Sequence, residues 1–331
     1  IRHDGCRSWV NGRSLSSMAA AVERVERLNR ASLRRVIEPD VDLPGAVGDG
    51  QLVADELLSV AGLDLGLTAE QRRILSREEV ASMFSAGTRF EAVLEIGFAR
   101  QVAYAPDLTD PRITYLLHEV GEETRHQRLF IRLISQIGPQ AIHPLEGKAW
   151  IDRLDRFGTG WITNHLAMLY VMVLAGEEIP DRMQKLASEH PDTDPFLASV
   201  NRYHRQEEAR HLSFARAMLP EVWAGASAVE RTVVRRIAPL VIQDLFRFMV
   251  HPGVYAQVGL DPWPTWKRVN KSPTRVQLRR VSTRPVLEAL LNAGVLERGS
   301  VPAAWQKLCG VDAHGAPHPV LTGASALVAA Q

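Results

Sequence analysis

One pentapeptide pattern, Glu-Glu-x-Arg-His, occurs twice in the sequence and constrains the fold more than any other feature. The first copy places Glu123 three residues before His126, and the second places Glu208 three residues before His211. A spacing of three residues puts two side chains on one face of an α-helix, where a carboxylate and an imidazole can bind the same metal ion. A single Glu-x-x-His is common on helix surfaces, so the repetition is what favours a metal site.

Each copy is preceded by a helical segment that carries an acidic residue at nearly the same distance. Glu91 lies 32 residues before Glu123, and Glu177 lies 31 residues before Glu208. The midpoint of each interval falls in a proline-containing segment that breaks a helix. In an antiparallel helical hairpin, residues at equal distances from the turn lie at the same level. Two such hairpins would bring four carboxylates and two imidazoles together, which is the ligand set of a dinuclear iron or manganese site in a four-helix bundle.

Two neighbouring glutamates compete for these assignments. Glu95 lies one turn nearer the hairpin loop than Glu91, which puts it about 6 Å off the common level. Glu178 points about 100° away from Glu177 around the helix axis. We therefore prefer Glu91 and Glu177 as ligands, and Glu95 stays an alternative for the first of them.

A third histidine makes the two halves of the site unequal. His204 lies four residues before Glu208 and seven before His211, so the three side chains share one stripe of a helix. A further imidazole can therefore reach one metal ion. The matching position in the first copy is Glu119, which we interpret as solvated or as a neighbour of the ligands rather than a ligand.

The first glutamate of each copy is a candidate partner for a ligating histidine. Such a histidine usually donates its other ring N–H to a carboxylate, a carbonyl or water. The pseudo-symmetry of the two hairpins predicts that Glu122 holds His211 and that Glu207 holds His126. The arginine in each copy could neutralise this acidic cluster.

The spacing of apolar residues and the positions of proline and glycine predict an all-α chain. Helices are expected at 18–37, 51–58, 68–75, 76–104, 112–137, 145–187, 196–218, 221–250 and 286–293. Gly158 or Gly160 is expected to bend or interrupt the helix at 145–187, and Pro180 to kink it. Thr68 is a candidate N-terminal cap.

These helices are expected to form one domain. Residues 1–75 would pack on the bundle, 76–250 would form its dinuclear four-helix core, and 251–331 would extend the same domain with a loosely ordered tail. The chain is 46% apolar and 23% charged, a balance that is typical of a globular protein with a sizeable core.

Charge and cysteine content exclude several classes of protein. A formal net charge of +1 gives no field that would draw the whole chain onto nucleic acid or anionic lipid. Two cysteines, Cys6 and Cys309, are too few for a disulfide scaffold or a Cys-ligated cluster. The longest strongly apolar stretch, 166–176, is shorter than the roughly 20 residues that span a bilayer. Since no secretory signal follows Ile1, we expect a cytoplasmic protein that binds neither nucleic acid nor membranes.

The motifs and the third histidine together resemble the para-aminobenzoate N-oxygenase family, which comprises ferritin-like diiron oxygenases of arylamines. The family pattern is Glu, Glu-x-x-His, Glu and His-x-x-x-Glu-x-x-His. It matches this sequence at Glu91, Glu123, His126, Glu177, His204, Glu208 and His211. The resemblance covers roughly residues 76–250 and implies a ferritin-like helical bundle with two iron ions, or manganese in their place.

The ligand types favour iron, which would reduce O₂, and the resemblance implies that a peroxo-diferric intermediate then oxygenates a small-molecule amine. Glu123 and Glu208 would bridge the metal ions, and His204 would supply the extra nitrogen, so these three are the candidate catalytic residues. Because no flavin or nicotinamide motif accompanies the site, we expect an external electron donor such as a ferredoxin or a reductase. A homodimer is expected by analogy with related helical oxygenases.

The alternative within enzymes is a diiron desaturase or C–H hydroxylase that acts on an acyl or other apolar substrate. An acyl carrier would then dock on a basic patch formed by Arg275, Arg279, Arg280 and Arg284. Apolar residues near the ligands are candidates to line a substrate cavity, namely Phe90, Val93, Leu94, Tyr170, Val173 and Leu174. A radical-bearing reductase subunit would need a tyrosine beside a metal ion, for which Tyr115 is the one candidate.

Overall fold

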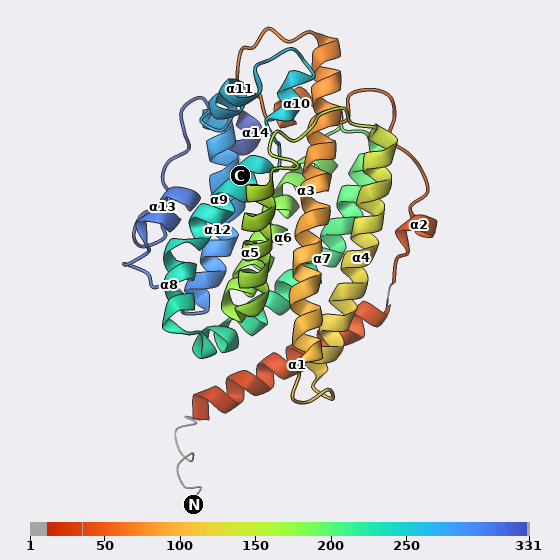
Figure 1. The fold of residues 1–331 in the computed structure, drawn as a ribbon. Helices are drawn as coiled ribbons and strands as arrows, with labels where there is room; N and C mark the ends of the chain where they lie inside the picture. The colour runs from red at the N-terminus through yellow and green to blue at the C-terminus, as the bar shows by residue number, and fades with distance from the viewer. Residues whose placement is uncertain (1–11, 35, 330–331) are drawn as a thin grey trace, which may run out of the picture.

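The computed structural model describes residues 12–34 and 36–329, and within them the fold is all-α, as predicted. Four long helices run side by side as a bundle (Figure 1). They are α3 (Ala69–Ala103), α4 (Pro111–Ile137), α6 (Leu166–Glu189) and α7 (Pro195–Gly225). Because α3 packs along α4 and α6 along α7, the bundle consists of two helical hairpins.

Both hairpins turn into their second helix through the same dipeptide, Asp-Pro. Asp110 caps α4 by accepting a hydrogen bond from the backbone N–H of Arg112, and Asp194 caps α7 in the same way from Leu197. The proline after each aspartate takes the first helical turn, where a missing N–H leaves no intrahelical bond unmade. The two hairpins thus share the chemistry that starts the second helix of each.

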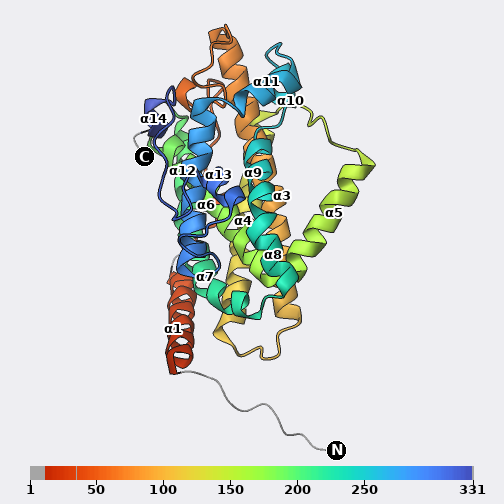
Figure 2. The ribbon, with the colours of Figure 1, turned by 90° about the vertical axis from the view of Figure 1, so that its left-hand side faces the viewer.

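The expected helix at 145–187 is two helices, and the expected break at Gly158 or Gly160 is wrong. α5 (Ala149–Asn164) ends before His165, whose extended backbone (φ −126°, ψ 97°) separates it from α6. The two helices are bent by 109° at this residue. Figure 2 shows α5 leaning away from the bundle.

The start of α6 is held by a glutamate from another helix. Glu230 on α8 (Ala228–Arg236) accepts hydrogen bonds from the backbone N–H groups of Ala167 and Met168, at 2.8 and 3.3 Å. These donors would otherwise be buried without a partner at the helix terminus. Pro180 lies inside α6 and does not end it.

Other expected boundaries also shift. The segment 51–58 holds only a short 3₁₀ turn at Asp55–Leu57, and the helices expected at 68–75 and 76–104 are the single helix α3. Its start carries a capping box, in which Thr68 and Gln71 exchange side-chain and backbone hydrogen bonds.

Proline ends fewer helices than its positions suggest. α7 continues through Pro220, and the segment that follows it splits into α8 and α9 (Ala238–Phe248). The short helix expected at 286–293 is the C-terminal part of α12 (Pro273–Asn292), which contains Pro285. The remaining helices are α1 (Gly12–Arg34), α2 (Pro39–Asp42), α10 (Gly253–Ala256), α11 (Pro262–Val269), α13 (Ala303–Cys309) and α14 (Ala326–Ala329).

The smaller helices cover the bundle on two sides. α1 packs across α4 and α7, while α9 and α12 pack against α6 (Figure 1). Among the described residues, no single helix is long and apolar enough to cross a membrane. Only α5 and α6 taken together, which are separated by their bend, have the length and composition of a membrane span.

Two apolar clusters fill the bundle, with a layer of charged residues between them. On α3, Glu91 lies between Phe84 of one cluster and Leu94 of the other. On α7, the residues from 204 to 211 lie between Tyr203 and Leu212 in the same way. Because the hydrophobic contacts on both sides hold the four helices, the charged layer itself need not provide the packing energy.

The predicted basic docking patch does not exist as a surface. Arg275 and Arg279 on α12 are buried and donate hydrogen bonds to backbone carbonyl groups. Arg284 also donates to a backbone carbonyl, that of Cys309, whose thiol is buried. Cys6 lies outside the described residues.

Candidate metal centre

All seven residues predicted as ligands meet in the charged layer at the centre of the bundle. Each side chain is buried. The possible ligand atoms form three groups of three residues. Within each group, one atom per residue lies within 4.8 Å of the other two. The groups are Glu91 with His126 and His204, Glu123 with Glu208 and His211, and Glu177 with His204 and Glu208.

The competing glutamates do not join these groups. Glu95 is only half-buried. Glu178 is buried but forms an ion pair with Arg216 on α7. The geometry therefore favours Glu91 over Glu95 and Glu177 over Glu178, in line with the helix-level argument.

The two histidines of the repeated motif are held crosswise. The Nε2 atom of His126 lies 3.1 Å from Glu207, and the Nε2 atom of His211 lies 2.8 Å from Glu122. Arg210 lies between these carboxylates, 3.0 Å from Glu122 and 3.2 Å from Glu207. The predicted exchange between hairpins is thus confirmed. An Nε2–H that donates to a carboxylate leaves the Nδ1 lone pair free for a metal ion.

The Nδ1 atoms of these two histidines face the inner carboxylates. His126 Nδ1 lies 3.2 Å from both Glu123 and Glu208. His211 Nδ1 lies 3.0 Å from Glu208 and 3.4 Å from Glu123. Both imidazoles therefore present the same ring nitrogen to the centre of the site.

His204 presents Nε2, rather than Nδ1, to the centre of the site. Its Nδ1 atom lies 3.0 Å from the amide oxygen of Gln184 on α6, while Nε2 lies 3.3 Å from Glu91 and 3.2 Å from Glu208. Burial lowers the pKa of His204 to about 4, so the ring is neutral and can act as a nitrogen ligand. Gln184 was missed by the sequence analysis, although its position seven residues after Glu177 places it on the same face of α6.

The carboxylates outnumber the cations available in the protein. Burial raises the pKa of Glu91 and of Glu177 well above the usual range, and the nearby Glu123 and Glu208 raise them further. Burial also acts on Glu122, but His211 and Arg210 outweigh it and lower the pKa to about 2. A buried set of acids with this excess of negative charge needs positive charge from elsewhere.

Unpartnered oxygens show where that charge fits. Glu91 Oε2, Glu177 Oε1 and Glu208 Oε1 are buried and accept no hydrogen bond. A buried carboxylate oxygen without a donor is costly unless a cation binds it. Mixed carboxylate and imidazole donors suit iron and manganese, and the residues therefore fit a dinuclear centre.

Glu119 was expected to be either solvated or a neighbour of the ligand residues, and the structure agrees with the second expectation. Its side chain is buried, and neither carboxylate oxygen has a hydrogen-bond partner. Burial raises its pKa well above the usual range, which favours a neutral carboxyl group. One turn away, the hydroxyl of Tyr115 is also buried without a partner. The first hairpin thus holds a buried acid at the position where the second holds His204.

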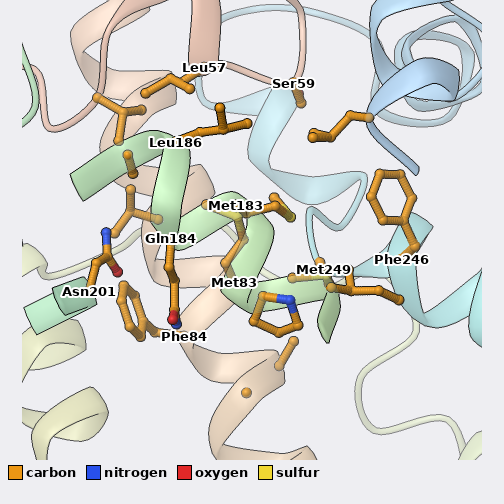
Figure 3. Close-up of a pocket in the computed structure, with 18 of the residues that line it drawn as sticks. Leu57, Ser59, Met83, Phe84, Met183, Gln184, Leu186, Asn201, Phe246 and Met249 are labelled. Atoms are coloured by element: carbon orange, nitrogen blue, oxygen red, sulfur yellow. The ribbon is translucent and has the colours of Figure 1, made fainter. Parts of the chain in front are cut away.

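A pocket opens onto the charged layer on the side of Glu91, Glu177 and His204. Figure 3 shows Met83, Phe84, Met183 and other side chains that line it. Of the six apolar residues predicted to form a cavity, only Phe90 lines this pocket. Four of the others, Leu94, Tyr170, Val173 and Leu174, belong to the apolar packing around it, and Val93 is half-buried and does not line the pocket, which corrects the prediction for these five residues.

The close approach of two helices shapes the pocket beside the ligand positions. Gly176 directly precedes Glu177, and a Cβ atom there would lie 1.8 Å from the ring of Phe90. Glycine therefore allows the Phe90 ring on α3 to lie directly against α6.

Comparison with known proteins agrees with the motifs. A family model described as p-aminobenzoate N-oxygenase AurF matches residues 19–294. Uncharacterised proteins of Mycobacterium tuberculosis and Mycobacterium bovis are each 26% identical over 256 residues, which cover 74% of this chain and 74% of theirs. A mutant R2-like ligand-binding oxidase with an aerobically reconstituted Mn/Fe cofactor aligns with a TM-score of 0.41 and 15% identity, covering 95% of this chain and 100% of its own.

The family match spans most of the chain and includes all seven residues of the buried cluster. The resemblance inferred from the repeated motifs is thereby confirmed. The enzyme uses O₂ and a cofactor of two iron ions. The chain therefore belongs to the p-aminobenzoate N-oxygenase AurF family of non-haem, ferritin-like oxidoreductases.

Proposed function

We propose that this enzyme N-oxygenates an amine, specifically an arylamine, at a diiron centre. The proposed ligands are Glu91, Glu123, His126, Glu177, His204, Glu208 and His211. The observation that carries the proposal is the apolar pocket that opens onto Glu91, Glu177 and His204, because it gives a small organic substrate access to one side of the centre. When bound, two iron ions would supply the electrons that activate O₂.

The chain's own residues position this chemistry. Glu123 and Glu208 project from α4 and α7 toward each other and would help to hold the two ions, since each lies close to both His126 and His211. Glu122, Glu207 and Gln184 fix the three imidazole rings through their outer nitrogens. Rings that are fixed in this way need not reorganise when the charge of the centre changes.

The apolar walls of the pocket would exclude water and hold an aromatic ring. Phe84, Phe90 and Phe130 line it beside the ligand positions, and Phe84 and Phe130 meet edge to face with ring centroids 4.7 Å apart. Aromatic rings prefer such edge and offset contacts. A planar arylamine fits this lining, and its amine would point toward the ligand carboxylates.

Electrons are proposed to come from a separate reductase or ferredoxin. No cofactor-binding motif for flavin or nicotinamide was found in the sequence. The test is reduction of the iron-loaded enzyme by a ferredoxin–reductase pair under anaerobic conditions. That the enzyme is a homodimer stays a prediction.

The function is tested with the iron-loaded enzyme, a chemical reductant and O₂. A panel of arylamines should give hydroxylamine, nitroso or nitro products that mass spectrometry detects, while Glu208→Ala gives none. A parallel panel of fatty acyl thioesters and alkylbenzenes tests the alternative of C–H oxidation. Hydroxylated or desaturated products with no N-oxygenated amine would refute the proposal.

A further inference from the structure

The two arginines of the repeated motif do not make equivalent contacts. Arg125 on α4 and Arg210 on α7 hold the same position in Glu-Glu-x-Arg-His. One terminal nitrogen of Arg210, Nη2, lies 3.0 Å from Glu122 and 3.2 Å from Glu207. Among the described residues, Arg125 pairs with Glu207 alone, and more loosely, at 3.7 Å. Of the two arginines, Arg210 is therefore the one that joins the outer carboxylates of both motifs to each other.

These two carboxylates are the groups that hold the motif histidines. The Nε2 atom of His211 lies 2.8 Å from Oε2 of Glu122, the same oxygen that Arg210 contacts. The Nε2 atom of His126 lies 3.1 Å from Glu207, whose other oxygen contacts Arg210. Partners of this kind set the orientation of a ligating imidazole and tune its metal ion. Each motif histidine is thus linked through one carboxylate to the same positive charge.

The two carboxylates depend on Arg210 to different degrees. Glu207 also accepts a hydrogen bond from the hydroxyl of Tyr203 at 2.9 Å. Glu122 has no such third partner among the described residues, where its donors are His211 and Arg210. Loss of the Arg210 side chain would therefore leave Glu122 with its histidine alone, whereas Glu207 would keep the tyrosine.

Arg210 lies away from the substrate side of the centre. Its side chain is 19% exposed, and the two glutamates that it contacts are buried. A charge pair that is largely removed from water interacts more strongly than one at the surface. Arg210 does not line the pocket that opens onto Glu91, Glu177 and His204. A change at Arg210 should therefore alter the centre without reshaping the pocket.

We propose that Arg210 is a positioning residue of the metal centre, which holds both outer carboxylates and, through them, both motif histidines, and whose charge raises the reduction potential of the bound iron pair. A fixed positive charge near a redox centre stabilises the reduced form, because reduction adds negative charge to the centre. The inference rests on the proposed function for the ligand residues, but not for the substrate or the reaction.

The repeated motif supplies a matched control. Arg125→Gln removes the same charge at the pseudo-symmetric position, where the side chain is 16% exposed, against 19% for Arg210. If any arginine near the centre served equally well, the two substitutions would have equal effects. If the bridge between the carboxylates matters, Arg210→Gln should have the larger effect.

The first measurement is iron binding by the metal-free protein under argon. Stepwise titration of Arg210→Gln with Fe²⁺ should show weaker binding of both ions, by about tenfold for the ion held by His211 and by less for the ion held by His126. Arg125→Gln should weaken at most the second of these. In a Glu122→Gln background, Arg210→Gln should cost the ion at His211 little more, since the link between them is already altered.

The second measurement is the midpoint potential of the iron-loaded enzyme, which a purely structural role would not move. Arg210→Gln should lower the potential by about 59 mV, equivalent to a tenfold change in a one-electron equilibrium. Arg210→Lys should restore most of it, because the charge remains and both contacts of Arg210 come from a single nitrogen. Arg125→Gln should shift the potential by less than half as much.

Three results would overturn the inference: an unchanged potential in Arg210→Gln, an equal shift in Arg125→Gln, or a loss of affinity confined to one ion. If Arg210→Gln does not fold, a lowered potential in Arg210→Lys overturns it, and a retained potential together with a smaller shift in Arg125→Gln supports it. If the role of Arg210 holds but no N-oxygenated product forms, the proposed reaction alone fails. A wild-type protein that binds no pair of iron ions refutes both proposals.

Discussion

The two hairpins of the bundle carry the same five-residue motif but differ at one position, where the second has His204 and the first has Glu119. In each, an Asp-Pro turn begins the motif-bearing helix and a glutamate of the other helix lies level with the motif. The histidines are then held crosswise, each by the glutamate of the other hairpin. Neither hairpin alone completes the buried cluster of acids and imidazoles.

The difference shows how a symmetric scaffold provides an asymmetric site. His204 is neutral, is held by Gln184, and faces Glu91 and Glu208 on the side where the pocket opens. Glu119 is buried without partners and does not line that pocket. The extra nitrogen thus lies beside the proposed substrate pocket, and the extra acid does not.

Loss of Glu208 should have the largest effect, because the proposed centre draws residues of both hairpins around it. Glu208→Ala should reduce metal content from about two ions per chain to near zero, since Glu208 lies beside all three histidines. Elemental analysis after gel filtration measures this. Glu178→Ala changes a buried glutamate on the neighbouring helix and should retain the metal. Two ions in Glu208→Ala would refute the shared centre.

A substitution at His204, the position where the two hairpins differ, should weaken the binding of one ion more than that of the other. His204→Ala removes the third nitrogen, so the ion on the pocket side should bind on the order of 100-fold more weakly while the other remains. Stepwise titration of the metal-free protein with Fe²⁺ under argon resolves the two affinities. Glu119→Ala, at the matching position, should leave the pocket-side affinity unchanged. Equal losses of both ions in His204→Ala would contradict the asymmetry.

The sequence was sufficient to predict which seven side chains meet at the centre of the bundle but not to predict the pocket, and the reason is geometric. A helix has a fixed period, so the spacings from Glu91 to His211 determine which side chains share a level before any tertiary contact is known. The pocket depends on how separate helices approach, for example at Gly176, and no local period encodes that. Likewise, Arg275 was assigned to a surface because four arginines in ten residues suggest a solvated face, whereas α12 buries two of them against other segments.

The first hairpin holds a further buried glutamate outside the metal-site cluster, Glu79, and its titration should make stability depend on pH. Burial raises the pKa of Glu79, on α3, from 4.5 to about 7. The unfolded chain therefore ionises first, so the unfolding free energy should fall as pH rises from 4.5 to 7 and stay reduced above that, by about 3 kcal/mol. Glu79→Gln should lack this fall.

Urea unfolding of wild type and variant at several pH values tests this, with the difference between the two proteins as the measured quantity. The amide introduced by Glu79→Gln keeps an acceptor for the backbone N–H of Ser59 and adds a donor for its hydroxyl, so it imitates the protonated acid. A constant difference in unfolding free energy from pH 4.5 to 7 would show that Glu79 stays ionised in the folded protein.

Weakening the hydrogen bonds between the hairpins, from His126 to Glu207 and from His211 to Glu122, should have the smallest effect on metal binding. It also tests directly whether the two hairpins are equivalent. Glu122→Gln and Glu207→Gln each replace a carboxylate that accepts from a histidine proposed as a metal ligand with a neutral amide of the same shape. Each should weaken the affinity for one ion about tenfold, at the lower end of the range for such partners, because the amide oxygen still accepts. If the hairpins are equivalent here, the two losses match in iron titration. A larger loss for Glu207→Gln would instead follow from Tyr203, which donates to Glu207 at 2.9 Å and would make that side the more strongly organised of the two.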